Sequence, residues 1–347
     1  MLDKIGTLEH AGIDATDLKQ LDSACGIDTI NSVTEIQDGV NASALLHTDT
    51  QDYFLKLQTF NRENTNTFSA QPFILQYFQD NSTPFSTPTP VAYDYTQGKL
   101  PERWLVTEAI NGDTLSLDAN NITPEVAGTV GRILGQVNSV QAAGYGPPTA
   151  PTTDDAATSI TGTLPFNSNN SWGKAFKQFI NHLLNTMAPR FYDLREPLES
   201  YVETVSVRSI TPSLLHFDYW WENILWDEHN TPHVIDWERA FGGDPLANLY
   251  LSKHYLFDTL TIDSNQYSSS FYNEDRRTLQ QEFSEAYKRT YTGDAPLAVD
   301  DHVDALYRVF PYIRELRGFP YWWRNETDEF KNKRAEALRA TLTSYIN

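Results

Sequence analysis

The sequence predicts an α+β protein in two lobes, the first rich in β-sheet and the second mainly helical. Short apolar runs separated by turn residues fill the chain up to about residue 110, and segments with helical periodicity follow from residue 124 onward. A compact strand-rich stretch at 213–237 interrupts these helices. A length of 347 residues accommodates two lobes, and we expect them to comprise residues 1–109 and 110–347.

The N-terminal lobe begins at 7–24, where apolar residues recur at roughly helical spacing, as in a short helix or a helix pair. Gly39 marks a first bend between strands, and residues 49–52 mark a second. A helix is expected at 68–79, in which Pro72 is tolerable only near the start. The expected strands lie at 33–36, 44–46, 53–57, 91–95 and 104–110.

The C-terminal lobe opens with a helix at 124–141, announced by the cap signal Thr123-Pro124. Its apolar residues recur at the i, i+4, i+7 spacing of one buried face. A loop rich in Gly, Pro, Thr and Asp fills 144–171. Further helices are expected at 172–187, 189–206, 244–262, 274–292, 299–315 and 326–345.

Composition limits the classes of function. Acidic residues outnumber basic ones by 46 to 26, and the net charge of −20 predicts no binding to nucleic-acid backbones. This charge suits a cationic substrate or a salt-rich cytoplasm, and solubility alone also explains it. No apolar run is long enough to span a membrane, and we expect no signal peptide. The single cysteine, Cys25, excludes an intrachain disulfide and fits the reducing cytoplasm.

The most informative stretch runs from His216 to Asp236. It contains His216-x-Asp218-x-x-x-x-Asn223, then an apolar strand, a turn at 227–230, and an apolar pair before Asp236. Phosphoryl transfer needs a carboxylate that orients the attacking hydroxyl and accepts its proton, and Asp218 is the candidate. It also needs oxygen ligands for magnesium, and Asn223 and Asp236 have this chemistry. We expect a hairpin between Asn223 and Asp236, and a hydrogen-bonding role for His216.

This stretch resembles the catalytic loop and metal-binding strand of the aminoglycoside phosphotransferase and choline kinase superfamily, and the resemblance covers most of the chain. It implies the protein-kinase-like bilobal fold, with ATP and Mg²⁺ as cofactors. Lys56 ends an apolar-apolar-Lys strand and is expected on the α- and β-phosphates. The segment 36–43 is similar to the phosphate-covering loop, which makes Gly39, Asn41 and Ser43 candidates for nucleotide binding.

Three further segments carry the resemblance. The segment 104–112 looks like the hinge between lobes, where the backbone of Glu108 and Ile110 is expected to hydrogen-bond adenine. The segment 130–139 resembles the helix after the hinge. The Gly-Asp-Pro of 242–249 resembles the segment that follows the metal-binding strand.

Four positions depart from the family pattern. Gln71 stands where a helix glutamate usually pairs with the strand lysine, and Phe217 stands where glycine is usual. Asn248 and Asn138 occupy positions that are often aspartate and histidine. These departures keep an alternative open, in which the chain is a pseudokinase that binds a nucleotide or metabolite without turnover.

The acceptor is expected to be a small molecule, because Gly-Asp-Pro follows Asp236 too closely for the long activation loop of a regulated protein kinase. The acidic residues Glu222, Glu238 and Asp244, together with nearby aromatics, suit a cationic acceptor of aminoglycoside, amino-sugar or choline type. Core packing is the simpler explanation of the aromatics. They are Tyr219, Trp220, Trp221, Trp237, Tyr321, Trp322 and Trp323. The oligomeric state stays open.

Overall fold

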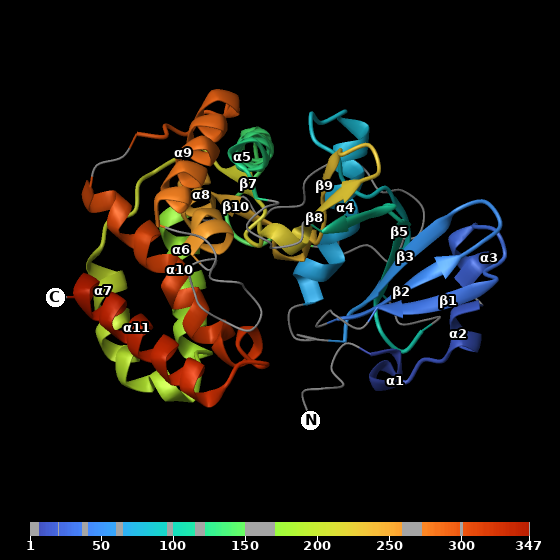
Figure 1. The fold of residues 1–347 in the computed structure, drawn as a ribbon, viewed down its shortest axis with the longest axis horizontal. Coiled ribbons are helices and arrows are strands. Elements are labelled where there is room, and N and C mark those ends of the chain that lie inside the picture. Colours follow the sequence, from blue (N-terminus) through green and yellow to red (C-terminus); the bar gives the residue numbers. More distant parts are fainter. Residues whose placement is uncertain are drawn as a thin grey trace. The chain divides into compact units, whose positions relative to one another are not determined.

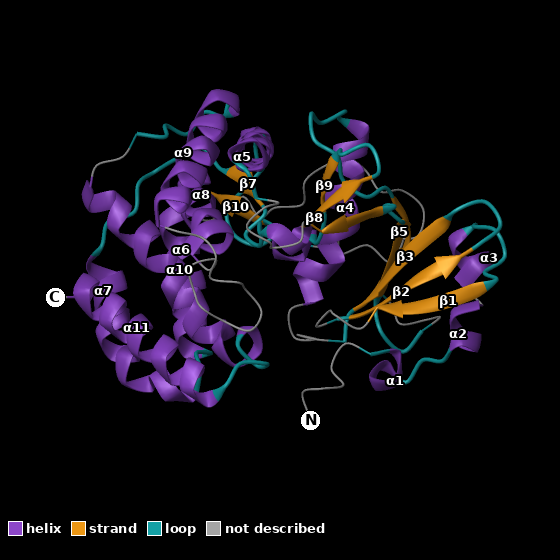
Figure 2. Cartoon of the chain, in the orientation of Figure 1, coloured by secondary structure: helices purple, strands orange, loops and turns teal. Residues whose placement is uncertain are grey.

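The chain divides into two units, which are described separately (Figure 1). The first takes the described residues of Met1–Asp113, Pro148–Pro165 and Ile224–Arg239, and the second takes the rest. Strands predominate in the first unit and helices in the second, which confirms the predicted fold class (Figure 2). The lobe boundary at residues 109 and 110 stays a prediction. The computed structural model describes residues 7–19, 21–36, 41–59, 65–95, 100–114, 122–149, 171–258, 273–298 and 301–346.

The first unit is built on an antiparallel sheet with the strand order β1-β2-β3-β5-β4. The predicted turn at 49–52 joins β2 to β3, and the hydroxyl of Thr48 donates to the carbonyl of Gln51 within it. Ser43 of β2 lies opposite Lys56 of β3, so both side chains are on one face of the sheet. The strands are β1 (Ser32–Ile36), β2 (Ala42–His47), β3 (Asp52–Leu57), β4 (Pro90–Asp94) and β5 (Trp104–Glu108).

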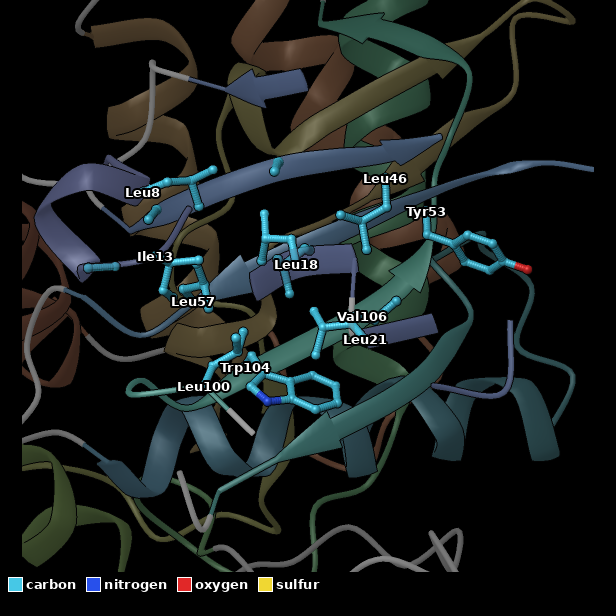
Figure 3. Packing of buried hydrophobic residues seen from close by; sticks show 14 of the residues in the cluster. Leu8, Ile13, Leu18, Leu21, Leu46, Tyr53, Leu57, Leu100, Trp104 and Val106 are labelled. Carbon is cyan, nitrogen blue, oxygen red and sulfur yellow. The ribbon is translucent and has the colours of Figure 1, made fainter. Parts of the chain in front are cut away.

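Three short helices supply the apolar partners of this sheet. Figure 3 shows Leu18 and Leu21 in one buried cluster with Leu57 and Val106. Because side chains alternate along a strand, Leu57 faces this cluster while the adjacent Lys56 lies on the opposite face. The single helix or helix pair predicted at 7–24 is thus three pieces. They are α1 (Leu8–Ala11), α2 (Ala15–Lys19) and α3 (Leu21–Cys25).

Helix α4 (Thr65–Asp80) begins earlier than predicted, so Pro72 lies inside it and the expectation that Pro72 would be near the start was wrong. Tertiary packing outweighs the backbone hydrogen bond that proline removes. Phe78 of α4 packs on Trp237, with ring centroids 4.6 Å apart. Trp237 belongs to the 3₁₀ turn η3 (Trp237–Arg239).

A small sheet of order β6-β8-β9 contains the predicted hairpin before Asp236. Ile224 pairs with Val234 across it. The turn at 227–230 is also confirmed, because the carboxylate of Asp227 accepts the N–H groups of His229 and Thr231. The strands are β6 (Gly112–Thr114), β8 (Ile224–Asp227) and β9 (Pro232–Val234).

The second unit consists of helices around the two-stranded ribbon of β7 and β10. The predicted cap is present, since Thr123 Oγ1 accepts the N–H of Val126. Its helices are α5 (Pro124–Ser139), α6 (Trp172–Asn185), α7 (Arg195–Thr204), α8 (Pro245–Lys253), α9 (Asn273–Thr290), α10 (Asp301–Trp322) and α11 (Asp328–Ile346). The remaining elements are β7 (Ser213–Leu215), β10 (Phe241–Gly243), the 3₁₀ turns η1 (Pro189–Leu194) and η2 (Trp221–Asn223), and the π-helical turn η4 (His254–Asp258).

Three of these helical segments differ from prediction. The helix expected at 189–206 begins as the 3₁₀ turn η1 and is α-helical only in α7. Helix α10 continues past the expected end at residue 315 and contains both Pro311 and Pro320. The expected helix at 244–262 changes at His254 into the π-helical turn η4, and its last four residues lie outside the described part of the chain. Within the described residues, no helix combines the length and apolar character that a bilayer crossing demands.

Candidate active site

Strand β7 ends at Leu215 and leads into the predicted catalytic loop, His216–Asn223. His216 is fully buried, and its Nδ1 accepts the N–H of Asp218 at 3.2 Å, as the sequence analysis expected. Asn223 Nδ2 donates to the carbonyl oxygen of Asp218 at 2.7 Å. Asp218 is therefore held through its own backbone on both sides, which fixes the point from which its carboxylate projects.

Phe217 has φ of +59°, in the left-handed region that favours glycine. This conformation explains why glycine is usual at the position in the resembling family. A phenylalanine there costs about 1–2 kcal/mol of backbone strain. Burial offsets this cost, because the Phe217 ring packs against Phe241 and Phe310 with centroids 5.0 and 5.5 Å away.

The departures Asn138 and Asn248 contact each other, although 110 residues separate them. Asn248 Nδ2 donates to Asn138 Oδ1 at 3.0 Å, and both residues are fully buried. Asn248 Oδ1 accepts the N–H of Phe217 at 3.2 Å, and Asn138 Nδ2 donates to the hydroxyl of Tyr287 at 3.0 Å. A neutral amide pair therefore supports the catalytic loop from α5 and α8.

Asp244 of the Gly-Asp-Pro segment is completely buried and has a structural task. It caps α8 by accepting the N–H of Leu246 at 3.0 Å, and it pairs with Arg208 through both oxygens at 2.5 and 2.7 Å. The hydroxyl of Tyr307 donates to it at 2.7 Å. With its oxygens engaged in this way, Asp244 does not supply the acceptor-binding charge suggested by the sequence.

The carboxylate of Asp218 has a partner that sequence analysis missed. Arg314 Nη2 donates to Asp218 Oδ1 at 2.8 Å, and Arg314 Nη1 donates to the carbonyl oxygen of Phe217. Arg314 comes from α10, 96 residues further along the chain. No local spacing connects it to the catalytic motif, so only the fold reveals the pair.

The first unit contains the predicted lysine and one predicted metal ligand in direct contact. Lys56 Nζ lies 2.7 Å from Asp236 Oδ1 and 3.0 Å from Glu238 Oε2. Burial alone lowers the pKa of Lys56, but the two carboxylates outweigh burial and raise the pKa above its ordinary value. Lys56 therefore stays charged. Asp236 has φ of +59°, a strained conformation for a non-glycine residue.

Gln71, at the position of the usual helix glutamate, is 5% exposed, and its Oε1 has no hydrogen-bond partner in the described structure. Lys56 takes its second carboxylate from Glu238, two residues after Asp236, instead of from α4. From the sequence alone, Glu238 was expected only as a source of negative charge for an acceptor. The missed signal is the Asp-x-Glu spacing, which places two carboxylates around one short turn.

Two of the three nucleotide-loop candidates are described. Asn41 Nδ2 donates to Glu238 Oε2 at 2.9 Å, so Asn41 joins the Lys56 cluster through that carboxylate. Ser43 Oγ donates to the carbonyl of Asn41 at 3.3 Å. Gly39 lies outside the described residues. Asn41, which immediately precedes β2, and Ser43, which lies within it, are therefore beside the predicted phosphate lysine.

The hinge candidates lie at the end of β5, where Glu108 is the last residue of the strand and Ile110 follows it. The N–H of Glu108 donates to the carbonyl of Thr89 at 2.9 Å, so this N–H is already engaged. Ala109 N–H donates to the carbonyl of Asp52 at 3.0 Å and ties the segment to the sheet. Ile110 is half-buried just beyond this bond. Adenine binding by Glu108 and Ile110 stays a prediction.

The predicted magnesium ligands have suitable donors. The amide nitrogen of Asn223 is committed to a carbonyl, which leaves its oxygen for a metal, and the Asp236 side chain is 28% exposed. In the described part of the chain, no three His, Cys, Asp or Glu residues converge.

Comparisons with known proteins identify the fold and the family. One similar structure is a thermostable mutant of aminoglycoside phosphotransferase APH(4)-Ia. The match covers 94% of this chain and 99% of that one, at 13% identity and a TM-score of 0.62. The match to choline kinase LicA from Streptococcus pneumoniae covers 95% of this chain and 99% of that one, at 16% identity and a TM-score of 0.59. The match to an APH(4)-Ia mutant in ternary complex with ADP and hygromycin B covers 94% of this chain and 97% of that one, at 15% identity and a TM-score of 0.56.

At these identities the structural matches show a shared fold. No curated protein matches the chain. The family profile described as the phosphotransferase enzyme family matches residues 32–297, which is more than half of the sequence. The chain belongs to the phosphotransferase enzyme family.

Proposed function

We propose that this protein transfers the γ-phosphate of ATP to a hydroxyl group of a small molecule, with Mg²⁺ as the metal. The observation that carries the proposal is the ion pair between Lys56 and Asp236, 2.7 Å long and formed across 180 residues of sequence. It joins the predicted phosphate lysine to the predicted metal carboxylate. The ADP and hygromycin B complex of a protein with the same fold supports a nucleotide and a small acceptor.

In this proposal each residue has a distinct task. Lys56 binds the α- and β-phosphates, and Asn223 and Asp236 hold the metal through oxygen donors. When bound at these residues, magnesium would neutralise negative charge on the phosphates of ATP. Asp218 orients the acceptor hydroxyl and takes its proton, while His216 and Asn223 fix its backbone.

The acceptor is limited to a small hydroxyl compound, because only η3, β10 and one connecting residue separate Asp236 from Asp244. A cationic acceptor of aminoglycoside, amino-sugar or choline type remains one arm of the proposal. Its support is reduced, since Asp244 and Glu238 are ion-paired and Tyr219, Trp221 and Trp237 are buried. A cytoplasmic location is also part of the proposal.

The test is phosphate transfer from Mg-ATP to a panel of alcohols, sugars, amino sugars, choline and aminoglycosides. Because of the net charge of −20, it is run at low ionic strength and at about 1 M KCl. Asp218→Asn is expected to lower kcat at least about 100-fold. Glu228→Gln, the same chemical change at an exposed turn residue, is expected to leave kcat unchanged. A panel without any turnover above this control sinks the proposal.

The alternative of a pseudokinase is favoured by one observation, the unpartnered Oε1 of buried Gln71. It predicts nucleotide binding without turnover, and binding that Asp218→Asn does not change. Isothermal titration calorimetry with ATP and ADP separates the two functions. Loss of transfer in both Asp218→Asn and Asp236→Asn would reject the pseudokinase.

A further inference from the structure

Arg314 is a buried cation at the predicted catalytic carboxylate, and the proposed function gives it no task. It is 9% exposed, and its guanidinium bonds to two consecutive residues, Phe217 through the carbonyl and Asp218 through Oδ1. Its Cζ lies 5.4 Å from the ring centroid of Tyr255. An aromatic ring and two oxygens therefore contact the guanidinium and hold it in place.

The contacts of Arg314 determine how the loop presents its carboxylate. Phe217 has positive φ, so the peptide that precedes Asp218 is held in a conformation that few residues adopt unaided. A planar fork that bonds the Phe217 carbonyl and the Asp218 carboxylate fixes the turn and the side chain together. A lysine has no such fork and would satisfy the two oxygens less well.

The two oxygens of Asp218 are left in different states. Oδ1 is occupied by Arg314 at 2.8 Å. Oδ2 lies 3.4 Å from Asn223 Nδ2, whereas the same nitrogen makes a 2.7 Å bond to the Asp218 carbonyl. Oδ2 is therefore the oxygen with the weaker contact, and it is the one available to a hydroxyl.

The Arg208–Asp244 ion pair of the same unit shows what a purely structural Arg–Asp pair looks like, and the Arg314–Asp218 pair differs from it. Asp244 is fully buried, and Arg208, Leu246 and Tyr307 engage both of its oxygens. The Asp218 side chain is 26% exposed beside an Arg314 side chain that is only 10% exposed. A purely structural pair would be expected to saturate its carboxylate, and this one does not.

We propose that Arg314 is a positioning residue for phosphate transfer, which holds Asp218 so that Oδ2 faces the acceptor hydroxyl. The inference rests on the proposed function. In the step, the acceptor oxygen forms a bond to the γ-phosphorus while the bond from that phosphorus to the β,γ-bridging oxygen breaks. The hydroxyl proton passes to Asp218 Oδ2, and the electron pair of the broken bond leaves with ADP.

The test is a double-mutant cycle with an acceptor from the panel, or with water if hydrolysis is the only turnover. Arg314→Met is expected to lower kcat about 100-fold and to change the dissociation constant of Mg-ATP less than about twofold. Arg314→Lys should be intermediate, because it retains the charge without the fork. In the Asp218→Asn background, Arg314→Met should change the residual rate less than about twofold, since its effect passes through the carboxylate.

Arg334→Met is the matched control. Arg334 pairs with Glu315, the neighbour of Arg314 on α10, at 2.6 Å. All rates are measured where circular dichroism shows the variants folded, and the control should keep the wild-type kcat. The inference on Arg314 is overturned, while the proposed function stands, if Arg314→Met lowers the rate equally in the wild-type and Asp218→Asn backgrounds. The same holds if Arg334→Met lowers kcat as much as Arg314→Met does. No turnover by the wild type overturns the proposed function and this inference with it.

Discussion

At the residue scale, the contact between Asn138 and Asn248 changes the meaning of two departures from the family pattern. Each substitution alone would leave a buried group unmatched, whereas together they form a neutral pair with a 3.0 Å hydrogen bond. Asn248 also accepts the backbone N–H of Phe217, so this pair supports the turn that leads to Asp218. The two departures are one structural solution, and they are not evidence for lost activity.

This pairing gives a stability prediction. Asn248→Asp removes the amide donor and buries a carboxylate, and should lower the free energy of unfolding by about 2–3 kcal/mol. Adding Asn138→His supplies a donor and should recover at least half of that loss. Urea unfolding of the wild type, both single variants and the double variant measures the coupling. Additive effects would contradict the pairing.

Lys56 and its carboxylates give a second prediction at this scale. Glu238→Gln removes a carboxylate that lies 3.0 Å from Lys56 Nζ and also accepts a hydrogen bond from the side-chain amide of Asn41. With Asp236 still in place, we expect kcat/KM for Mg-ATP to fall about tenfold. The exposed Glu228→Gln serves again as the control.

The same experiment tests whether α4 can resume the usual role. If Gln71 faces Lys56, Glu238→Gln combined with Gln71→Glu should regain most of the lost kcat/KM. If Gln71 does not face Lys56, the double variant should have a lower kcat/KM and a lower free energy of unfolding than Glu238→Gln alone, because it buries an unpaired carboxylate. Unchanged activity in the Glu238→Gln single variant would mean that Glu238 does not support Lys56.

Residues found from sequence and residues found only from structure differ in one physical respect. Asp218, Asn223, Asp236 and Lys56 lie in local patterns whose spacing reports the chemistry. The positive φ of Phe217 depends on tertiary packing, since a bulky residue rarely adopts it unaided, and aspartate, as at Asp236, adopts it in only a minority of positions. The Arg314–Asp218 pair requires α10 to pack on the catalytic loop, which no window of sequence contains.

At the element scale, α5 and α9 pack with backbone close to backbone. A Cβ on Gly131 would lie 2.2 Å from the carbonyl oxygen of Phe283, whereas a Cβ on Gly128 would meet nothing nearer than 4.0 Å. Gly131→Ala should therefore lower the free energy of unfolding by about 2–3 kcal/mol. Gly128→Ala, on the same helix, should be neutral or stabilising by up to about 1 kcal/mol. Urea unfolding compares them, and equal effects would contradict the close approach.

A buried charged network joins η4, α10 and α11. Glu315 pairs with Arg334 at 2.6 Å, and His254 lies 3.4 Å from Glu315 and 3.5 Å from Asp258. Burial alone raises the pKa of Glu315, but Arg334 and His254 outweigh it and lower the pKa to about 2. Burial alone lowers the pKa of His254, but its two carboxylate partners outweigh it and raise the pKa above 6.5.

The network therefore predicts a pH window of stability. The contribution of Glu315 is present above pH 4.5 and is lost as pH falls toward about 2; it is on the order of 3 kcal/mol. The contribution of His254 is complete below pH 6.5 and is lost as pH rises through its raised pKa. Urea unfolding of wild type and Glu315→Gln from pH 3 to 8 checks this. If the free energy of unfolding of Glu315→Gln falls as steeply toward low pH as that of the wild type, Glu315 is not the cause of the acid destabilisation.

Most elements could be predicted from sequence because their signals are local. The Thr123 cap, the hairpin before Asp236 and the sheet of the first unit all have such signals. The extension of α10 through Pro311 and Pro320, and the π-helical turn at His254, could not be predicted in this way. In both places tertiary packing outweighs local propensity, and such packing depends on residues far away in sequence.

At the scale of the whole molecule, the residues of the proposed chemistry are divided between two units. Lys56, Asp236 and Glu238 belong to the first unit, and Asp218, Asn223 and Arg314 belong to the second. The family pattern predicted Lys56, Asp218, Asn223 and Asp236 as one set, whereas the roles of Glu238 and Arg314 emerge only from the structure. The charge of the chain is a property of both units together, since acidic residues exceed basic ones by 20.

That charge predicts how stability depends on salt. At pH 7 the net charge of −20 produces self-repulsion, which unfolding relieves. Raising the ionic strength from about 0.01 M to 1 M shortens the screening length from about 30 Å to 3 Å, so Tm should rise. Near pH 4.7, where the net charge is close to zero, the same salt change should have little effect on Tm through repulsion. Differential scanning calorimetry at both pH values separates screening from general salting-out, which stabilises at either pH. An equal rise of Tm at both pH values would show that the acidity does not limit the stability of the fold, and the excess carboxylates would then serve solubility alone.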